Sequence, residues 1–327
     1  MEKIINLRIP HVGENIFENI GTDELLQYFL VSHTWKVLAE NVLLKRWKSK
    51  FFEACLSGRK KIVQLLLEHY ESEDIGLNAR NEYGQTAFIC ACSKGHLDIV
   101  KLLLDNSDRN IELNARNNHG HTAFIFACSI GHTDIVKLLL EFSDRNIDVN
   151  AVSNLGRNAF MLACFKGREN VVKLLLDNSD ISLNARANHG ITALMFACAN
   201  GRKKVVKLLL ENSDIEVNAR SNEGKTALMM ACANGYKDIV LLMEHSDKMF
   251  DVNVRANNGW TAFMFACAKG QKEVVKLLLK YSEFNFDTTG LDLSEEMKDF
   301  VNSRKMPRRS ARLAEKNQSS STSPQSQ

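Results

Sequence analysis

Long apolar runs are missing from this sequence. No stretch of about 18 apolar residues occurs, so no membrane-spanning helix is expected. The N-terminal stretch MEKIINLRIP contains neither a long apolar segment nor a small-residue cleavage site, and we therefore expect no signal peptide. Eight cysteines in a chain without a secretory signal are expected to be reduced thiols in the cytoplasm or the nucleus.

Net charge is also nearly absent, at +3 for 327 residues. The C-terminal end alone contributes +5, because Glu315 is outnumbered there by six basic residues: Arg304, Lys305, Arg308, Arg309, Arg312 and Lys316. The rest of the chain has 36 basic and 38 acidic residues. Because phosphate binding needs clustered cations, nucleic acid is not expected to be the main ligand of the body.

Familiar catalytic motifs are missing as well. The chain has no nucleophile elbow, no zinc-protease helix and no glycine-rich dinucleotide loop. Glu223–Thr226 reads EGKT, but Ala219 stands where a phosphate loop needs its first glycine. His119–His121 and Cys90–Cys92 occupy repeat positions that other repeats fill differently, and a zinc site needs four converging ligands. We therefore expect no enzyme activity, no metal and no cofactor.

What the sequence does contain is a repeat. Seven of the eight cysteines occur in the pattern Cys-x-x-Gly, at a spacing of 34 to 37 residues: Cys55, Cys92, Cys128, Cys164, Cys198, Cys232 and Cys267. A nearly fixed period of this size indicates a stack of similar structural repeats.

Each repeat reads as a polar turn followed by two helices. The turns centre on glycines: Gly84, Gly120, Gly156, Gly190, Gly224 and Gly259. Thr192 or Thr226 is then expected to cap a short apolar first helix. Gly201 or Gly235 ends that helix, and a second helix follows with Val and Leu at helical spacing. A single repeat cannot bury its apolar face, so stability must come from its neighbours.

The pattern resembles the ankyrin repeat over residues 49–287. The resemblance rests on the turn glycines, the Thr-Ala-Leu and Thr-Ala-Phe helix starts, and the GHxDIVKLLL stretches at Gly95–Leu104 and Gly131–Leu140. It departs from the family at Thr86–Ile89, which reads Thr-Ala-Phe-Ile in place of Thr-Pro-Leu-His. All three prolines lie outside the array: Pro10, Pro307 and Pro324. The resemblance implies an all-α solenoid of seven helix-turn-helix repeats with short β-hairpin fingers.

Two further segments follow the repeats. Residues 288–301 are expected to form a C-terminal capping helix, with Ser294 as N-cap and Glu295 and Glu296 in the first turn. Residues 302–327 have the composition of a disordered tail. The stretch RKMPRRSARLAEK within it has the composition of a nuclear-import signal or an electrostatic arm, which leaves a cytoplasmic or nuclear location open. The alternative is a basic cluster without a function, since such clusters are frequent by chance in disordered tails.

The finger tips and the inner face of the first helices are the candidate binding surface. Side chains beside the turn glycines differ between repeats, and Ile130 and Phe165 are expected to add an apolar spot. Tyr83 and Trp260 are potential aromatic anchors. The alternative is that the tips vary because nothing constrains them. The candidate partner-binding residues are Tyr83, His119, His121, Ile130, Leu155, Arg157, Phe165, His189, Ile191, Lys225 and Trp260.

A row of arginines recurs with the same period. It is interrupted by Val152 and consists of Arg80, Arg116, Arg186, Arg220 and Arg255. Basic residues are common at this position in ankyrin fingers, so we interpret the row as part of the scaffold and not as a site.

The N-terminal segment has no counterpart in the repeats. Thr22 is a suitable N-cap, Asp23 and Glu24 suit the first turn, and Leu25 and Leu26 begin an apolar helical stripe. Three short helices in so few residues bury too little surface to be stable alone. The segment must therefore lean on the repeats, on a partner, or on both.

The spacing of its apolar residues resembles the F-box, which we place at residues 1–48. Gly13 and one missing residue before Ile16 depart from the family pattern. The resemblance implies docking on the Skp-type adaptor of a cullin–RING ubiquitin ligase through Ile9, Pro10, Ile16, Phe17, Leu25, Leu26, Leu30, Val31 and Trp35. The chain would then be the substrate-recognition subunit, and its repeats would capture the target protein. The alternative is a scaffold or inhibitor without a ubiquitin link, in which these helices are only a cap.

Overall fold

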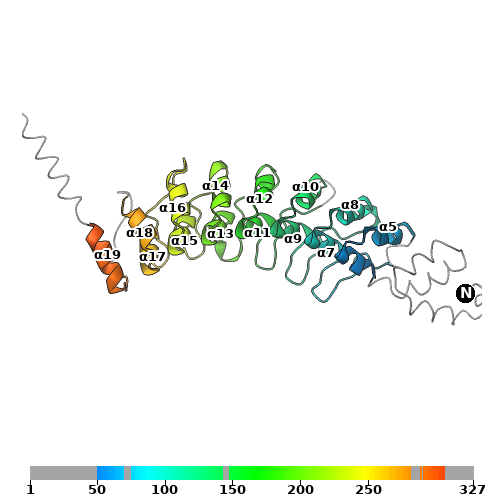
Figure 1. Cartoon of the computed structure of the whole chain (residues 1–327), viewed down its shortest axis with the longest axis horizontal. Helices are drawn as coiled ribbons and strands as arrows, with labels where there is room; N and C mark the ends of the chain where they lie inside the picture. The colour runs from blue at the N-terminus through cyan, green and yellow to red at the C-terminus, as the bar shows by residue number, and fades with distance from the viewer. Residues whose placement is uncertain (1–49, 70–74, 143–146, 281–287, 289, 306–327) are drawn as a thin grey trace, which may run out of the picture. The chain divides into compact units, whose positions relative to one another are not determined.

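The computed structural model describes residues 50–69, 75–142, 147–280, 288 and 290–305. Within these ranges every regular element is an α-helix or a short 3-10 helix (Figure 1). The chain divides into two compact units, Met1–Asn154 (unit 1) and Leu155–Gln327 (unit 2). No helix of the described ranges is both long and apolar enough to cross a membrane. The F-box-like segment 1–48 and the tail beyond Lys305 lie outside the described residues.

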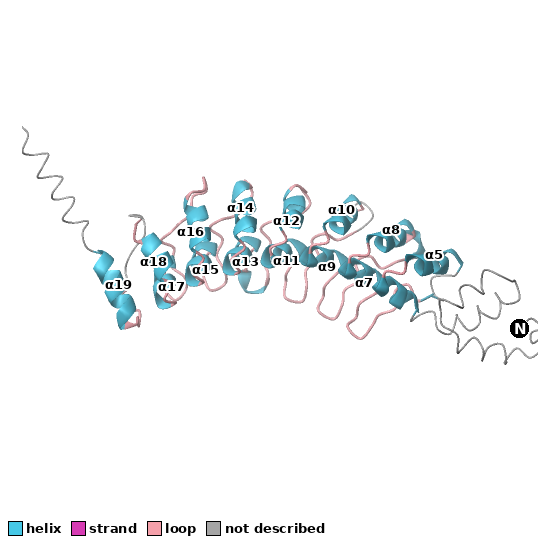
Figure 2. Cartoon of the chain, viewed as in Figure 1, coloured by secondary structure: helices cyan, strands magenta, loops and turns pink. Residues whose placement is uncertain are grey.

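Unit 1 is built from helix pairs that follow a helical segment at residues 50–57. Its elements are α5 (Lys60–His69), α7 (Ala87–Lys94), α8 (Leu97–Asp105), η1 (Ser107–Arg109), α9 (Ala123–Ile130) and α10 (Thr133–Glu141). First helices α7 and α9 pack side by side, and each also contacts its own second helix, α8 or α10. The finger loops project on the side away from the second helices (Figure 2).

Unit 2 repeats this arrangement. Its elements are α11 (Ala159–Lys166), α12 (Glu169–Leu176), η3 (Asn188–Gly190), α13 (Ala193–Ala199), α14 (Lys203–Glu211), α15 (Ala227–Ala233), α16 (Lys237–Glu244), α17 (Ala262–Ala268), α18 (Lys272–Leu278) and α19 (Glu295–Lys305). First helices α11, α13, α15 and α17 form one continuous row of contacts, and second helices α12, α14, α16 and α18 form another. This is the two-layer stack that the period of the sequence predicts.

The predicted N-caps are confirmed. Thr192 Oγ1 accepts a hydrogen bond from Met195 N at 3.4 Å, and Thr226 Oγ1 accepts one from Met229 N at 3.4 Å. Asn158 replaces threonine at the start of α11, and its side-chain oxygen accepts from Met161 N at 2.9 Å. A side-chain acceptor here satisfies a backbone N–H that the first turn leaves without an intrahelical partner.

The core differs between the two helix layers. First helix α13 is buried from Ala193 to Cys198, whereas second helix α14 buries one face, which includes Val205, Val206 and Leu209. The first helices therefore form most of the buried core of the stack. An aromatic residue at their second position is almost fully enclosed in four repeats, at Phe88, Phe124, Phe160 and Phe263.

The cysteines belong to this core. All eight thiols are buried and none of them forms a disulfide. Burial raises the pKa of the Cys198 thiol well above its usual range, and it raises the pKa of Cys90 to about 11. At neutral pH both side chains are therefore uncharged, and they act as small packing groups in the core.

The prediction of β-hairpin fingers is wrong for the described residues, which contain no strand. One representative finger is closed by two backbone bonds, Asn117 N to His121 O at 3.0 Å and Gly120 N to Asn117 O at 2.8 Å. Neighbouring fingers share one backbone–backbone hydrogen bond, such as that from Asn118 N to Tyr83 O at 3.0 Å. Isolated bonds of this kind do not build the continuous ladder of a sheet.

The last described element of unit 2 is helix α19, which contacts α18. Met297 and Val301 are buried, and Met297 N donates to Ser294 Oγ at 3.3 Å. The helix continues to Lys305, past residue 302, at which we expected the tail to begin.

Candidate protein-interaction surface

At the finger tips the backbone is hydrogen-bonded to the neighbouring finger, while the side chains remain accessible to solvent. In unit 1 Asn154 N donates to His119 O at 3.0 Å, and in unit 2 Asn222 N donates to His189 O at 2.8 Å. The tip side chains stay open to solvent, since Tyr83 is 59% and Leu155 is 54% exposed. The scaffold thus fixes where each tip lies without covering its side chain.

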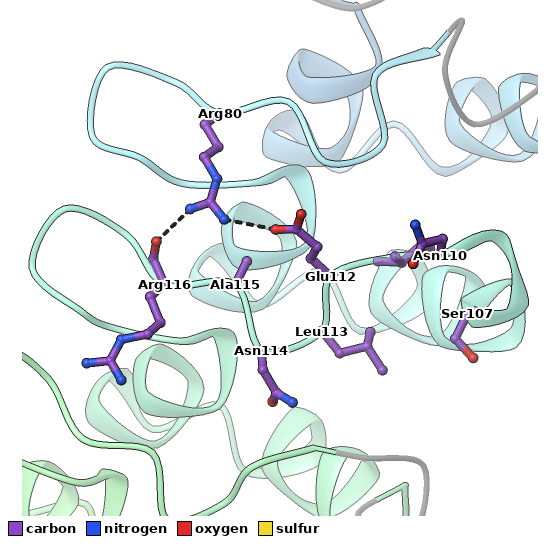
Figure 3. Close-up of a pocket in the computed structure, with 9 residues that line it drawn as sticks. Arg80, Ser107, Asn110, Glu112, Leu113, Asn114, Ala115 and Arg116 are labelled. Atoms are coloured by element: carbon purple, nitrogen blue, oxygen red, sulfur yellow. Dashed lines mark hydrogen bonds and ion pairs between the residues drawn. The ribbon is translucent and has the colours of Figure 1, made fainter.

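The arginine row belongs to the scaffold, as we interpreted it. Arg80 donates to Arg116 O at 2.6 Å and to the Glu112 carboxylate at 2.8 Å (Figure 3). Arg116 in turn donates to Val152 O. Because the acceptor is a backbone carbonyl, valine at position 152 provides it as well as arginine would.

The same connection runs through the second unit. Arg186 donates to Arg220 O at 2.6 Å, and Arg220 donates to Arg255 O at 2.9 Å. The guanidinium groups of Arg186 and Arg220 therefore tie their fingers to the backbone of the next finger along the chain.

An open groove lies beside Arg80 in Figure 3. It has a volume of about 610 Å³ and is lined by Arg80, Ser107, Asn110, Glu112, Asn114 and Arg116, among others. A groove of about 520 Å³ recurs in unit 2 at the equivalent Arg186, Glu216 and Arg220. Because the groove recurs with the repeat and its guanidinium groups bind backbone carbonyls, we assign it to the scaffold.

The scaffold role of this row makes a first prediction. Changing Arg186 to alanine removes its bond to Arg220 O and is expected to lower the free energy of unfolding by about 1 kcal/mol. Changing Lys173, an exposed cation of α12, to alanine is the matched control and is expected to cost less than about 0.5 kcal/mol. Urea denaturation followed by circular dichroism measures both. Equal losses in the two variants would contradict the assignment.

In two repeats the side chain that follows the turn glycine packs against an aromatic ring of the first helix. In unit 1 the His121 ring lies edge-on to Phe126, with centroids 5.3 Å apart and planes at 85°. In unit 2 Trp260 and Phe265 make a similar contact at 5.2 Å and 64°. Edge-to-face contacts of this kind stabilise the position of both rings.

Two cations of unit 2 also lie over rings. The Arg157 guanidinium carbon is 5.0 Å from the Phe196 centroid and 5.8 Å from the Phe165 centroid. The Lys225 ammonium is 5.6 Å from the Phe265 centroid. These distances are within the range of cation–π attraction. We call the six residues the aromatic–cationic strip: Arg157, Phe165, Phe196, Lys225, Trp260 and Phe265.

The structure brings together only some of the residues that we selected from sequence. Arg157 meets Phe165, and His119 lies 6.3 Å from His121 between ring centroids. Ile130 is 39% exposed in unit 1, whereas Phe165 is half-buried in unit 2. Ile191 is half-buried in the finger that precedes α13. The predicted adaptor-binding residues from Ile9 to Trp35 lie outside the described residues.

His189 differs from the other tip residues in its backbone. Its φ is +65°, and Asn110 is the only other described non-glycine residue with positive φ. This conformation costs a non-glycine residue roughly 1–2 kcal/mol. The neighbouring finger holds it, because Asn222 N donates to His189 O.

Two rings of the strip were not among the residues predicted from the sequence. Phe196 and Phe265 are 9% and 7% exposed, and both occupy the fourth position of a first helix. That position varies more than its buried neighbours and could have drawn attention: Cys90, Phe126, Leu162, Phe196, Met230 and Phe265. No group of three or more His, Cys, Asp or Glu side chains in the described part of the chain is placed to hold a metal ion.

Comparison with known proteins agrees with this architecture. A family model for ankyrin repeats, in a form that spans three copies, matches residues 18–117, 109–187, 181–255 and 241–294. The crystal structure of the ankyrin repeat domain of Bcl-3, a member of the IkappaB protein family, superposes with a TM-score of 0.59 at 24% identity. That match covers 70% of this chain and 96% of the Bcl-3 chain. At this identity the likeness establishes the fold alone.

One curated relative matches over a short stretch. It is the leucine-rich repeat serine/threonine-protein kinase 1 of Caenorhabditis elegans, 40% identical over 55 residues. The match takes in 16% of this chain and only 2% of the length of that kinase. The family match, by contrast, extends over most of the sequence. The chain belongs to the ankyrin-repeat family.

Proposed function

We propose that this chain captures a protein through the inner side of its repeats and delivers it to a ubiquitin ligase through its N-terminal segment. Ankyrin repeats are protein-interaction modules, which supports the first half. The observation that carries it is the aromatic–cationic strip, in which the Arg157 and Lys225 cations lie over aromatic rings of the first helices and Trp260 packs against one of these rings. The second half rests on the F-box-like spacing of residues 9–35.

In this proposal the chain performs no chemistry of its own. Holding a target beside activated ubiquitin raises the effective concentration of the two reactants, and partner subunits carry out the transfer. The proposed division is an adaptor-binding segment at 1–48, seven repeats at 49–287, a cap at 288–301 and a tail at 302–327. The basic stretch of the tail is the proposed nuclear-import element.

A second function is favoured by one specific observation. The first ankyrin match begins at residue 18 and so overlaps the segment on which adaptor docking depends. If residues 18–48 form repeat-like helices that cover the first repeat, the chain is a scaffold or inhibitor without a ubiquitin link. Adaptor binding separates the two proposals.

The decisive experiment is a pull-down of the whole chain with a purified Skp-type adaptor. We expect the wild type to bind and the double variant Leu30→Ala/Trp35→Ala to lose at least about tenfold in affinity, because large buried anchors dominate interfaces. The matched control is Tyr83→Ala/Leu155→Ala, which removes an aromatic and a leucine side chain from exposed finger tips. It should bind the adaptor as the wild type does.

Circular dichroism and thermal unfolding show whether the repeats of each variant remain folded. An intact array with lost adaptor binding in the Leu30/Trp35 variant supports docking by the N-terminal segment. If the wild-type chain does not bind the adaptor at all, the ligase proposal is contradicted, and the proposal of a scaffold or inhibitor is favoured.

A further inference from the structure

We infer that the aromatic–cationic strip of unit 2 binds an extended acidic segment of a partner protein. The carboxylates of this segment would pair with Arg157 and Lys225, and the apolar side chains of the segment would pack on Phe165 and Trp260. The inference rests on the part of the proposed function in which the repeats capture a protein, and it is independent of adaptor docking.

Two clusters make up the strip. Arg157 with Phe165 and Phe196 forms the first, and the two rings meet edge to face at 5.9 Å and 87°. Lys225 with Trp260 and Phe265 forms the second. In both clusters a cation lies above a phenylalanine that the core encloses. Rings that hold a cation in place reduce the entropy it loses when a carboxylate binds.

The helix end that carries Phe165 is itself fixed. Arg202 Nε donates to Phe165 O at 2.9 Å, which ties the end of α11 to the start of α14. The Lys166 ammonium lies 5.1 Å from the centroid of the Phe165 ring and adds another positive charge to the first cluster. A pre-positioned ring flanked by cations is a suitable contact for a segment that alternates acidic and apolar residues.

Charge distinguishes this inner face from the outer one. The residues that flank the turn glycines, together with the last two of each first helix in unit 2, include three cations and one carboxylate: Arg157, Lys166, Lys225 and Glu223. The outer face of the second helices mixes both signs. Lys203 and Asp238 pair at 2.9 Å, as do Lys237 and Glu273 at 3.1 Å. The inner face, where cations outnumber the single carboxylate Glu223, has a charge that complements an acidic segment.

Glu223 is the carboxylate that an acidic ligand would have to displace. Lys225 donates a hydrogen bond to it, and this bond together with the charge of Lys225 lowers the pKa of the Glu223 carboxyl. Glu223 thus occupies the second cluster as a negatively charged group from the chain itself. A partner carboxylate that replaces it would take over the same ammonium.

The spacing of the clusters defines the ligand further. Arg157 precedes α11 and Lys225 precedes α15, with α13 between these two helices in the row. At the usual 8–10 Å between packed helices, the two cations are roughly 16–20 Å apart. An extended chain rises about 3.3 Å per residue, so acidic residues about five or six positions apart would reach both clusters.

A protein segment fits this face better than nucleic acid does. Glu223 interrupts the positive charge, and the half-buried Phe165 and Trp260 offer apolar contact. Apart from the C-terminal end, the chain has 36 basic and 38 acidic residues and so lacks the general positive field that nucleic acid requires.

Fluorescence anisotropy with the whole chain tests the inference. The probe is a labelled peptide of about 12 residues, long enough at about 3.3 Å per residue to span both clusters. It carries two Asp-Glu pairs about six positions apart with Phe and Leu between them. We expect saturable binding that weakens as salt is raised, and no binding of the same peptide with Asn-Gln pairs.

Charge reversal then locates the site. Arg157→Glu/Lys225→Glu is expected to weaken peptide binding at least about tenfold, which corresponds to about 1.4 kcal/mol. Lys173→Glu/Lys276→Glu makes the same change in net charge on exposed positions of second helices and should change affinity less than about twofold. Glu223→Gln should tighten binding about two- to threefold, because it removes the competing carboxylate. If Arg157→Glu/Lys225→Glu lowers the midpoint of thermal unfolding, the milder variant Lys166→Gln/Lys225→Gln replaces it in the binding experiment. We expect this variant to lose less affinity for the peptide.

Three results would overturn the inference: no saturable binding by the wild type, equal losses in the strip and control variants, or tighter binding of single-stranded poly-U RNA through the same residues. The adaptor pull-down distinguishes this failure from failure of the ligase proposal. If the chain binds the acidic peptide but not the adaptor, the inference about the strip is supported and the ligase proposal is contradicted. If it binds the adaptor but not the peptide, the ligase proposal is supported and the inference about the strip is contradicted.

Discussion

Changing Phe160 to alanine is expected to lower the free energy of unfolding by about 3–5 kcal/mol. The side chain is 1% exposed and lies at the second position of α11, which packs against α12 and α13. Truncation loses the transfer free energy of the ring and leaves a cavity that fixed backbones on both sides cannot close. Because stacked repeats are stable only through their neighbours, the loss extends beyond one repeat.

Urea denaturation followed by circular dichroism measures this loss. Leu155→Ala serves as the control, since it also shortens an apolar side chain but one that is 54% exposed, and it is expected to cost less than about 0.5 kcal/mol. If Phe160→Ala cost no more than Leu155→Ala, the first helices would not form the core that we describe.

The second large effect is expected at a finger glycine. Gly224 has a φ of +74°, and a Cβ added there would lie 2.9 Å from Asn257 N and 2.5 Å from Asn257 Oδ1. Gly259 has a φ of +82°, but no atom of the described residues lies within 4 Å of an added Cβ. Alanine at either position must adopt the left-handed backbone conformation, which is expected to lower the free energy of unfolding by roughly 1–2 kcal/mol. At Gly224 it also pushes the next finger away, which is expected to add about 1–3 kcal/mol.

The difference between Gly224→Ala and Gly259→Ala therefore measures how closely neighbouring fingers approach. Thermal and urea unfolding of the two variants side by side gives that difference directly. Closely similar losses would show that the positive φ accounts for the whole effect, and would contradict the tight finger-to-finger packing.

The repeat architecture could be predicted because its signal is local and repeated. Turn glycines, Thr192 and Thr226 as N-caps, and apolar residues at helical spacing each specify a local geometry, and the structure has all of them. The interpretation of the arginine row as scaffold agrees with the backbone carbonyls that Arg80, Arg116, Arg186 and Arg220 bind in the next finger. The β-hairpin form of the fingers was wrong, because the fingers exchange single backbone bonds and not a ladder.

The candidate surface was predictable only in part. Variation beside the turn glycines identified Arg157, Lys225 and Trp260 as residues of interest. The sequence could not place Phe196 beneath Arg157, because that contact joins the finger of one repeat to the first helix of the next. Contacts between repeats depend on the rotation of each repeat relative to its neighbour, which the repeat period does not specify.

The most direct test of the account is whether one chain joins an adaptor to an acidic partner. The whole chain, a purified Skp-type adaptor and the labelled acidic peptide are mixed and separated by size-exclusion chromatography. We predict that the label elutes with the adaptor only when the chain is present, and that Leu30→Ala/Trp35→Ala or Arg157→Glu/Lys225→Glu each removes it. Elution of the chain apart from the adaptor, or of the peptide apart from the chain, would contradict the account.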